Sequence, residues 1–307
     1  MEEFASMTNV DGVITRTVDA RVPVMDRGFL YGDSVYEVFR TYGGIPLFYD
    51  EHWARFENSA RLIHLGLGLT KAQMTDEIRQ TIRMSNARAA NRDVYVRYTV
   101  TRGIGPVDLF PDPELVTRYV IIVKELQDWN PGFYRDGVRL AVPQTRRNPT
   151  SALDPNIKGG NYLNNVLGVI EARALGADDC VMLDDAGLIT EASNSNVFFV
   201  LDGGLITPGA SAGHLRGLTK AAVEEACAAD GLPTHAREIT VEDLTRTSEC
   251  FVTSATREIM PVVSLRLPNG HTLAFPQGGG AVTKRVMSCY RAFVDTYLRD
   301  HAHLCLF

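Results

Sequence analysis

Hydrophobic and polar residues alternate along several stretches between residues 12 and 125, and this alternation predicts β-strands with one buried face. The clearest stretch is 35–42 (VYEVFRTY), which is followed by Gly43-Gly44 and a second apolar segment at 45–48. Two such stretches joined by a Gly-Gly pair predict a β-hairpin. Further strands are predicted at 13–18, 94–101 and 119–123.

The strand predicted at 35–42 carries an arginine between two tyrosines. Tyr36, Arg40 and Tyr42 should share one face of this strand, because side chains alternate between the two faces of a sheet. An arginine in this setting is able to receive a substrate carboxylate, and it is equally able to serve as a structural arginine. The pattern leaves both interpretations open.

A helical period replaces the alternation in two stretches that follow the hairpin. Phe56 and Ile63 mark the apolar face of a helix predicted at 50–65. A second helix is predicted at 70–85, with Thr70 as its N-terminal cap.

The order of these elements divides the chain into two domains. Strands with two helices predict an α+β domain over residues 1–127. The sequence Trp-Asn-Pro-Gly at 129–132 is typical of a loop, so we expect an interdomain linker at 128–138. A second domain, 139–307, follows. Its strands are predicted at 138–142, 180–183, 197–201 and 251–256, and its helices from Leu163 onward, at 217–230 and at 281–298.

Composition narrows the class of protein. The chain has 307 residues, of which 45% are hydrophobic and 22% charged, as expected for a soluble globular protein of about two domains. The net charge of −6 argues against nucleic acid as a main partner. No apolar run reaches the roughly 18 residues of a membrane helix, and the acidic N-terminus does not resemble a signal peptide. Five scattered cysteines and dispersed histidines predict a reduced, cytoplasmic protein without a metal.

A single lysine, Lys158, stands between the turn-forming residues 154–156 and the pair Gly159-Gly160. An apolar helical period begins directly afterwards at Leu163, so we expect Lys158 at the end of a tight turn that feeds a helix. The two glycines allow a ligand to approach the backbone closely. A lysine amine in this position suits Schiff-base formation with a carbonyl group. Taken alone, such a lysine is more often a solvated loop residue.

Three further segments add groups that a phosphate-bearing heterocycle would need. The predicted helix start at 217–219 (GLT) offers backbone N–H groups, a hydroxyl group and the positive end of a helix dipole. The segment 254–256 (SAT) follows a strand and offers similar donors. Glu191 lies among small polar residues, where its carboxylate is able to meet a ring nitrogen. An amine, a phosphate site and a carboxylate together predict a pyridoxal 5'-phosphate enzyme.

The residues of several motifs, and the order of these motifs along the chain, resemble those of the fold-type IV pyridoxal-phosphate enzymes, or class IV aminotransferases. The resemblance covers nearly the whole chain, from Asp26-Arg-Gly-Phe-Leu-Tyr-Gly-Asp33 to the segment 280–284. It includes Lys158-Gly-Gly-Asn-Tyr162, the segment 190–196 (TEASNSN), and 253–261 (TSATREIMP). The fold that it implies is α+β with two domains, like D-amino-acid aminotransferase. The smaller N-terminal domain would be α/β and the larger C-terminal domain would have a β-barrel-like core.

The same resemblance implies a role for each matched residue. Lys158 would form the Schiff base with the cofactor and move the proton of the substrate α-carbon. Glu191 would keep the pyridine nitrogen protonated, and Arg55 would bind the phosphate group. The remaining residues implied to bind the cofactor are Tyr162, Asn196, Gly217, Leu218, Thr219, Ser254, Ala255 and Thr256. The spacing after Lys158 is closer to that of the D-amino-acid enzymes, which lack a tyrosine at the position of Tyr162.

The residues that would bind substrate match two subgroups in part. Tyr31, Tyr36, Arg40 and Arg97 match side chains that line the pocket of branched-chain aminotransferases. Arg102 matches the arginine that holds the substrate carboxylate in D-amino-acid aminotransferases, although the histidine that follows it there is absent.

These matches favour transamination of branched-chain or other L-amino acids with 2-oxoglutarate, by a homodimer that binds small molecules. The alternatives are a D-amino-acid or mixed-specificity transaminase, an (R)-amine transaminase, an aminodeoxychorismate lyase, and an inactive protein that uses the same fold for binding.

Overall fold

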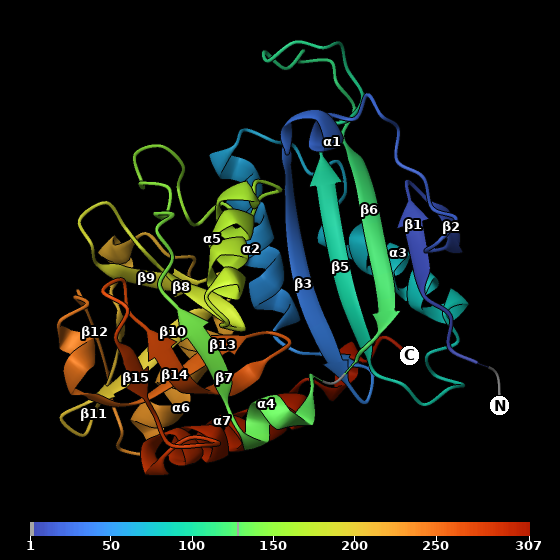
Figure 1. Ribbon diagram of the computed structural model, residues 1–307. Coiled ribbons are helices and arrows are strands. Elements are labelled where there is room, and N and C mark those ends of the chain that lie inside the picture. The colour runs from blue at the N-terminus through green and yellow to red at the C-terminus, as the bar shows by residue number, and fades with distance from the viewer. Residues whose placement is uncertain (1–2, 128) are drawn as a thin grey trace. The chain divides into compact units, whose positions relative to one another are not determined.

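The computed structural model describes residues 3–127 and 129–307, which form two compact units (Figure 1). Unit 1 consists of Met1–Gln127, Ile157–Asn161 and Tyr297–Phe307, and unit 2 of Asp128–Asn156 and Tyr162–Thr296. In these described ranges no helix is long and apolar enough to cross a membrane.

This division differs from the predicted domains at three places. The C-terminal segment Tyr297–Phe307 belongs to unit 1, although it was predicted to lie in the second domain, 139–307. The expected linker at 128–138 begins at a residue outside the described ones, and it contains helix α4 (Pro131–Arg135) and the first residue of strand β7 (Val138–Ala141), both in unit 2. Ile157–Asn161 belongs to unit 1 because its backbone bonds to strand β3 (Ser34–Tyr42). The N–H of Tyr36 donates to the carbonyl oxygen of Lys158 at 2.9 Å, and Gly160 donates to Ser34 at 3.0 Å.

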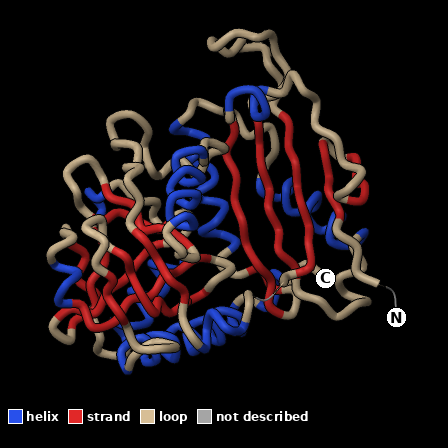
Figure 2. The backbone as a smooth tube through the Cα atoms, viewed as in Figure 1, coloured by secondary structure: helices blue, strands red, loops and turns tan. Residues whose placement is uncertain are grey.

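Unit 1 is built on an antiparallel sheet with the strand order β2-β1-β6-β5-β3-β4 (Figure 2). The other strands of this sheet are β1 (Met7–Val10), β2 (Val13–Arg16), β4 (Ile45–Pro46), β5 (Val94–Thr101) and β6 (Arg118–Glu125). The predicted hairpin is confirmed, since β3 pairs with β4 around Gly43 and Gly44. Both glycines have positive φ angles, +55° and +84°, which residues with a Cβ atom rarely adopt.

One face of this sheet is covered by helices. Helix α1 (Arg27–Tyr31) precedes β3, while α2 (Tyr49–Leu62) and α3 (Lys71–Met84) pack on the sheet through a shared core. Phe39 from β3 and Phe56 from α2 are fully buried in this core. The predicted cap of α3 is confirmed, because the hydroxyl oxygen of Thr70 accepts a hydrogen bond from the N–H of Gln73. The alternation in β3 thus points its odd-numbered residues toward the helices.

Unit 2 is built on a mixed sheet with the order β12-β11-β10-β13-β14-β7-β8-β9, and β15 pairs with β14. Its end strand β9 also lies against β10 and β11, so the sheet curls into a half-barrel. The α+β fold with two sheets, predicted with a barrel-like second domain, is confirmed. The strands not yet defined are β8 (Asp179–Leu183), β9 (Ile189–Ala192), β10 (Asn196–Leu201), β11 (Gly204–Pro208), β12 (Thr234–Arg237), β13 (Thr247–Ser254), β14 (Glu258–Arg266) and β15 (Thr272–Ala274).

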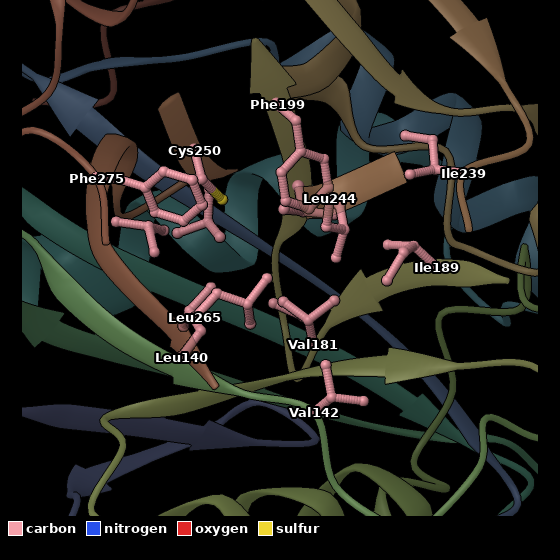
Figure 3. Packing of buried hydrophobic residues seen from close by; sticks show 14 of the residues in the cluster. Leu140, Val142, Val181, Ile189, Phe199, Ile239, Leu244, Cys250, Leu265 and Phe275 are labelled. Atoms are coloured by element: carbon pink, nitrogen blue, oxygen red, sulfur yellow. The ribbon is translucent and has the colours of Figure 1, made fainter. Parts of the chain in front are cut away.

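The inside of this curled sheet is filled by aliphatic and aromatic side chains (Figure 3). Leu140 from β7, Phe199 from β10 and Leu265 from β14 are among them. Helices α5 (Leu163–Ala174), α6 (Leu218–Ala229) and α7 (Ala281–Asp300) complete the unit, with the last residues of α7 counted in unit 1. Single 3-10 turns lie at Ala210–Ala212, Asp243–Arg246 and Ala302–Leu304.

Candidate active site

Lys158 is held by unit 1 through its backbone and its side chain. Its N–H donates to the hydroxyl oxygen of Ser59 on α2 at 3.1 Å, and its carbonyl oxygen accepts from Tyr36 on β3. Its amine lies 4.7 Å from the centre of the Tyr36 ring. An ammonium group at this distance over an aromatic face is attracted by the ring. The lysine is therefore fixed between a strand and a helix, and is not a freely solvated loop residue.

Arg97 approaches the same aromatic ring as Lys158. Its guanidinium carbon lies 3.7 Å from the centre of the Tyr36 ring, which is nearly buried. Arg40 lies farther along β3, with its guanidinium carbon 4.2 Å from the ring centre of Tyr42. Of the residues predicted to bind substrate, Tyr36 therefore lies beside Lys158, and Arg97 contacts the same ring.

Tyr31, the last residue of α1, packs differently. Its ring lies 4.9 Å from the guanidinium carbon of Arg27. Tyr31 is also more exposed than Tyr36: its exposed fraction is 36%, whereas Tyr36 is nearly buried.

Arg102 uses all three of its guanidinium nitrogens for hydrogen bonds within unit 1. Its Nε donates to Oδ2 of Asp33 at 2.7 Å. Its Nη1 and Nη2 donate to the carbonyl oxygens of His64 and Ile63 at 2.9 and 2.8 Å. These carbonyls follow the last turn of α2, where a cation is favourable. Arg102 thereby ties the end of β5 to the end of α2.

Arg55 is joined to a buried carboxylate that was not singled out from the sequence. Its Nε and Nη2 donate to Oε1 and Oε2 of Glu37 at 2.6 and 2.8 Å. The Nδ1 of His52 also lies 2.7 Å from Oε2 of Glu37. The available signal was a charged residue at an inward position of β3, between Val35 and Phe39.

The charges of this buried cluster follow from its geometry. Burial alone raises the pKa of Glu37, but the Arg55 cation and the hydrogen bonds from Arg55 and His52 outweigh it and hold that pKa well below its usual range. Burial also lowers the pKa of His52, against the opposing attraction of Glu37. A neutral His52 then donates its Nδ1–H to an ionised Glu37, which is paired with a charged Arg55.

Glu191 lies on β9 in unit 2 and is almost fully buried. Its Oε1 lies 3.0 Å from Nη2 of Arg147, and its Oε2 accepts from the N–H of Leu215 at 3.2 Å. Arg147 in turn donates to Oδ1 of Asn165 at 3.1 Å. Arg147 and Asn165 were not predicted. Together these contacts hold a buried carboxylate in place, as a partner for a cationic ring nitrogen requires.

The segment before α6 packs tightly against Asn196. The amide nitrogen of Asn196 donates to the carbonyl oxygen of Leu215 at 3.0 Å. A Cβ atom at Gly217, the N-cap residue, would lie 1.8 Å from Oδ1 of Asn196, so only glycine fits there. Gly217 has no side chain with which to cap the helix, so the N–H groups at Leu218 and Thr219 have no partner from the N-cap residue. Such a helix start is suited to an anion.

Two other predicted segments also lie in unit 2. The turn of Ser254, Ala255 and Thr256 joins β13 to β14, and it is held from both sides. The hydroxyl oxygen of Ser254 accepts from the N–H of Arg257 at 3.2 Å, and the carbonyl oxygen of Thr256 accepts from the indole of Trp129 at 3.1 Å. Tyr162 is the N-cap residue of α5.

The candidate residues of the two units therefore lie on helices and strands or on turns next to them, in a fold with two sheets. Residues 34–265 match the Amino-transferase class IV family. The chain belongs to this family, and it is an aminotransferase by class.

Two relatives indicate the range of the family. The chain is 34% identical over 282 residues to a putative branched-chain-amino-acid aminotransferase of Methanocaldococcus jannaschii. The matched region covers 92% of this chain and 94% of the relative. The chain is 29% identical to a D-alanine aminotransferase of Bacillus licheniformis, over 91% of this chain and 93% of the relative.

Solved structures of the family resemble the fold closely. The branched-chain aminotransferase of Thermoproteus uzoniensis, solved with norvaline, superposes with a TM-score of 0.85 at 27% identity, over 96% of this chain and 98% of that one. A second branched-chain aminotransferase, complexed with N-(5'-phosphopyridoxyl)-L-glutamate, gives 0.82 at 26% identity, over 95% of each chain. The predicted membership of the family is confirmed.

Proposed function

We propose that this protein is a pyridoxal 5'-phosphate-dependent aminotransferase that transfers the amino group of branched-chain or other L-amino acids to 2-oxoglutarate. The observation that carries the proposal is the Lys158 amine over the Tyr36 ring, which Arg97 also contacts, in a chain of this family. The adduct with L-glutamate in the second of the two solved enzymes supports the choice of an L-amino acid and of 2-oxoglutarate, the oxo acid of glutamate.

The residues of both units fit the chemistry of the cofactor. Lys158 supplies an amine, and Glu191 supplies a buried carboxylate for the pyridine nitrogen. The N-cap residue of α6 is Gly217, whose missing side chain leaves the first N–H groups to other partners, and such a helix start suits a phosphate group. Arg55, Asn196 and the turn of Ser254, Ala255 and Thr256 complete the proposed set, and Tyr162 is proposed for the phenolic oxygen of the cofactor.

Each residue then has a stated task. When bound, pyridoxal phosphate supplies a carbonyl carbon that condenses with amines and a ring that accepts electrons. Lys158 would take up the proton of the substrate α-carbon on its Nζ and release it again as the amino group is transferred. Glu191 would keep a proton on the ring nitrogen, since its carboxylate is held in place by Arg147 and by the N–H of Leu215. Tyr36 and Arg97 shape the substrate side of Lys158.

The mode of binding the substrate carboxylate separates the leading candidate from its alternative. Arg102 would hold that carboxylate in a D-amino-acid enzyme. A D-amino-acid aminotransferase is the alternative because D-alanine aminotransferases are among the relatives. The hydrogen bonds of Arg102 to Asp33, His64 and Ile63 favour a structural role instead. We therefore propose Tyr31, Arg40 and Arg97 for the substrate pocket, and a homodimer as the assembly.

A donor screen tests the proposal. Purified protein loaded with pyridoxal phosphate is given L-leucine, L-valine, D-alanine or (R)-1-phenylethylamine, with 2-oxoglutarate or pyruvate, and the new amino acid is measured. The expected result is glutamate from L-leucine and L-valine. Preference for D-alanine or for the amine would establish the alternative. No turnover with any donor would contradict an aminotransferase of either kind. Omission of the protein is the control.

A further inference from the structure

Glu37 occupies a position where a hydrophobic residue would be expected. It points to the helix-covered face of β3, between Val35 and Phe39, and all three side chains are fully buried. A carboxylate at such a position is expensive to bury unless charged partners surround it. Replacing a buried ion pair by apolar residues is often neutral or stabilising, so burial of Glu37 is poorly explained by stability alone.

The contacts of Glu37 have one geometric consequence. Its two oxygens meet Nε and Nη2 of Arg55 in a two-pronged pair, which fixes the plane of the guanidinium group. The ring of His52 and the N–H of Val38, at 3.2 Å, hold Oε2 from other sides. The carboxylate of Glu37 is therefore held by several partners, and its pair with Arg55 constrains the guanidinium group.

The side chain of Arg55 is more exposed than those of Glu37 and His52, with which it forms the buried cluster. Its side chain is 13% exposed, whereas that of Glu37 is 0% exposed and that of His52 is 2% exposed. One helical turn away, Ser59 donates its hydroxyl hydrogen to the carbonyl oxygen of Arg55 at 2.9 Å and accepts from the N–H of Lys158. The anchored arginine thus belongs to the same turn of α2 that supports the reactive lysine.

We propose that Glu37 is a positioning residue that holds the guanidinium group of Arg55 in the orientation in which it receives the phosphate group of the cofactor. This inference rests on the proposed function, because it needs Arg55 to bind phosphate. An unpaired arginine has four rotatable side-chain bonds, and ordering it at the moment of binding lowers affinity. Pairing with Glu37 orders the guanidinium group before the ligand arrives.

The test compares two ligands that differ only in the phosphate group. Apoprotein is titrated with pyridoxal phosphate and with pyridoxal, and each dissociation constant is taken from absorbance or fluorescence. The dissociation constant of pyridoxal divided by that of pyridoxal phosphate reports the contribution of the phosphate group. Glu37→Gln should lower this ratio about tenfold, since affinity for pyridoxal phosphate falls and that for pyridoxal does not.

Combination with an Arg55 variant shows whether Glu37 acts through Arg55. In an Arg55→Lys background, Glu37→Gln should change the ratio less than about twofold, because the planar guanidinium group that Glu37 orients is already gone. An undiminished effect in that background would mean that Glu37 acts on the phosphate by another route, which overturns the proposal.

Thr41 provides a matched control on the same strand. It is buried on the same face of β3 as Glu37, but its hydroxyl donates to Asp93 at 2.7 Å. Thr41→Val should leave the ratio unchanged. If Glu37→Gln fails to fold, Glu37→Asp keeps the charge but is one methylene too short to make the observed pair, and it should lower the ratio about threefold.

The outcomes separate this inference from the proposed function. A wild-type apoprotein that binds neither ligand, or binds both equally, would contradict the proposed cofactor. A wild-type protein that prefers pyridoxal phosphate, with Glu37→Gln or Glu37→Asp retaining the wild-type ratio, would overturn the role of Glu37 alone.

Discussion

The hydroxyl oxygen of Ser59 on helix α2 accepts a hydrogen bond from the backbone N–H of Lys158 at 3.1 Å. Residues 59 and 158 are far apart in the sequence, and the contact joins the turn that carries the lysine to the helix that carries Arg55. The Lys158 carbonyl oxygen is bonded on its other side to the N–H of Tyr36. The backbone of the reactive lysine is thus fixed at both of its polar groups, so its amine has only side-chain freedom.

Lys158→Ala should abolish transamination while leaving the fold intact. The variant loses the group that moves the proton, and general acid–base catalysis alone contributes roughly 10²–10⁴-fold. Both backbone bonds of residue 158 survive in alanine, so thermal unfolding should change little. Single-turnover and steady-state assays with L-leucine measure the effect. Turnover within about tenfold of wild type would rule out Lys158 as the proton carrier.

Ser59→Ala is the matched variant for the same turn. It removes the acceptor of the Lys158 N–H but leaves the amine in place. A lost hydrogen bond of this kind should cost about 1 kcal/mol of stability. Turnover should fall far less than in Lys158→Ala. Equal losses in the two variants would show that the position of the turn, and not the amine, limits the reaction.

Glu191→Gln should lower turnover more than it weakens retention of pyridoxal phosphate. The amide fills the same space between Arg147 and the Leu215 N–H, but it has no negative charge with which to keep a proton on a ring nitrogen. Turnover at saturating cofactor and the dissociation constant of the cofactor are measured separately. A variant that loses cofactor but regains the full rate when cofactor is resupplied would exclude Glu191 as the partner of the ring.

Most elements of the fold could be predicted from local patterns. The hairpin at Gly43-Gly44 and the cap at Thr70 follow from turn and capping chemistry that acts over a few residues. The membership of Ile157–Asn161 in unit 1 could not be predicted, because it depends on backbone bonds to a strand more than 100 residues earlier. No local pattern records a contact of that range.

The candidate site shows the same limit. Lys158 and Glu191 were singled out because the motifs around them resemble those of the class IV aminotransferases, whereas either residue taken alone was not decisive. Glu37 and Arg147 were missed, since each is defined by a partner on another element: Arg55 on α2 for Glu37, and Glu191 on β9 for Arg147. For Glu37 a signal did exist: a lone charge at an inward position of an alternating strand requires a buried counter-ion.

Arg102→Leu should destabilise the protein but leave the Michaelis constant for amino acids nearly unchanged. The variant leaves the carbonyl oxygens of His64 and Ile63 without this donor, while Asp33 keeps its pair with Arg27 at 3.1 Å. Loss of such hydrogen bonds should cost about 1–3 kcal/mol, seen as a lower unfolding temperature. Steady-state kinetics with L-leucine and D-alanine are the measurement. A rise above about a hundredfold in the Michaelis constant for L-leucine would show that Arg102 binds the substrate carboxylate.

His214 links the stability of unit 2 to pH. It is buried in the segment before α6, and its Nε2 lies 3.1 Å from Nζ of Lys220. Burial, aided by the charges of Lys220 and Arg216, lowers the pKa of His214 to about 4. The unfolded chain has the ordinary histidine value of about 6.5. Between these two values the unfolded state binds a proton that the folded state does not, so stability falls as the pH drops.

Because of this difference between the pKa values of His214 in the folded and unfolded states, the protein should be about 2 kcal/mol less stable at about pH 5 than at about pH 8. His214→Gln abolishes the titration, yet its side-chain oxygen is able to accept the hydrogen bond from Lys220. The unfolding temperature of this variant should therefore fall less than that of wild type between the two pH values. His271→Gln, at an exposed position, is the control and should follow wild type. If the unfolding temperature of His214→Gln falls as much as that of wild type at low pH, another group is responsible for the loss of stability. The expected direction and pH range both depend on His214 being neutral in the folded state.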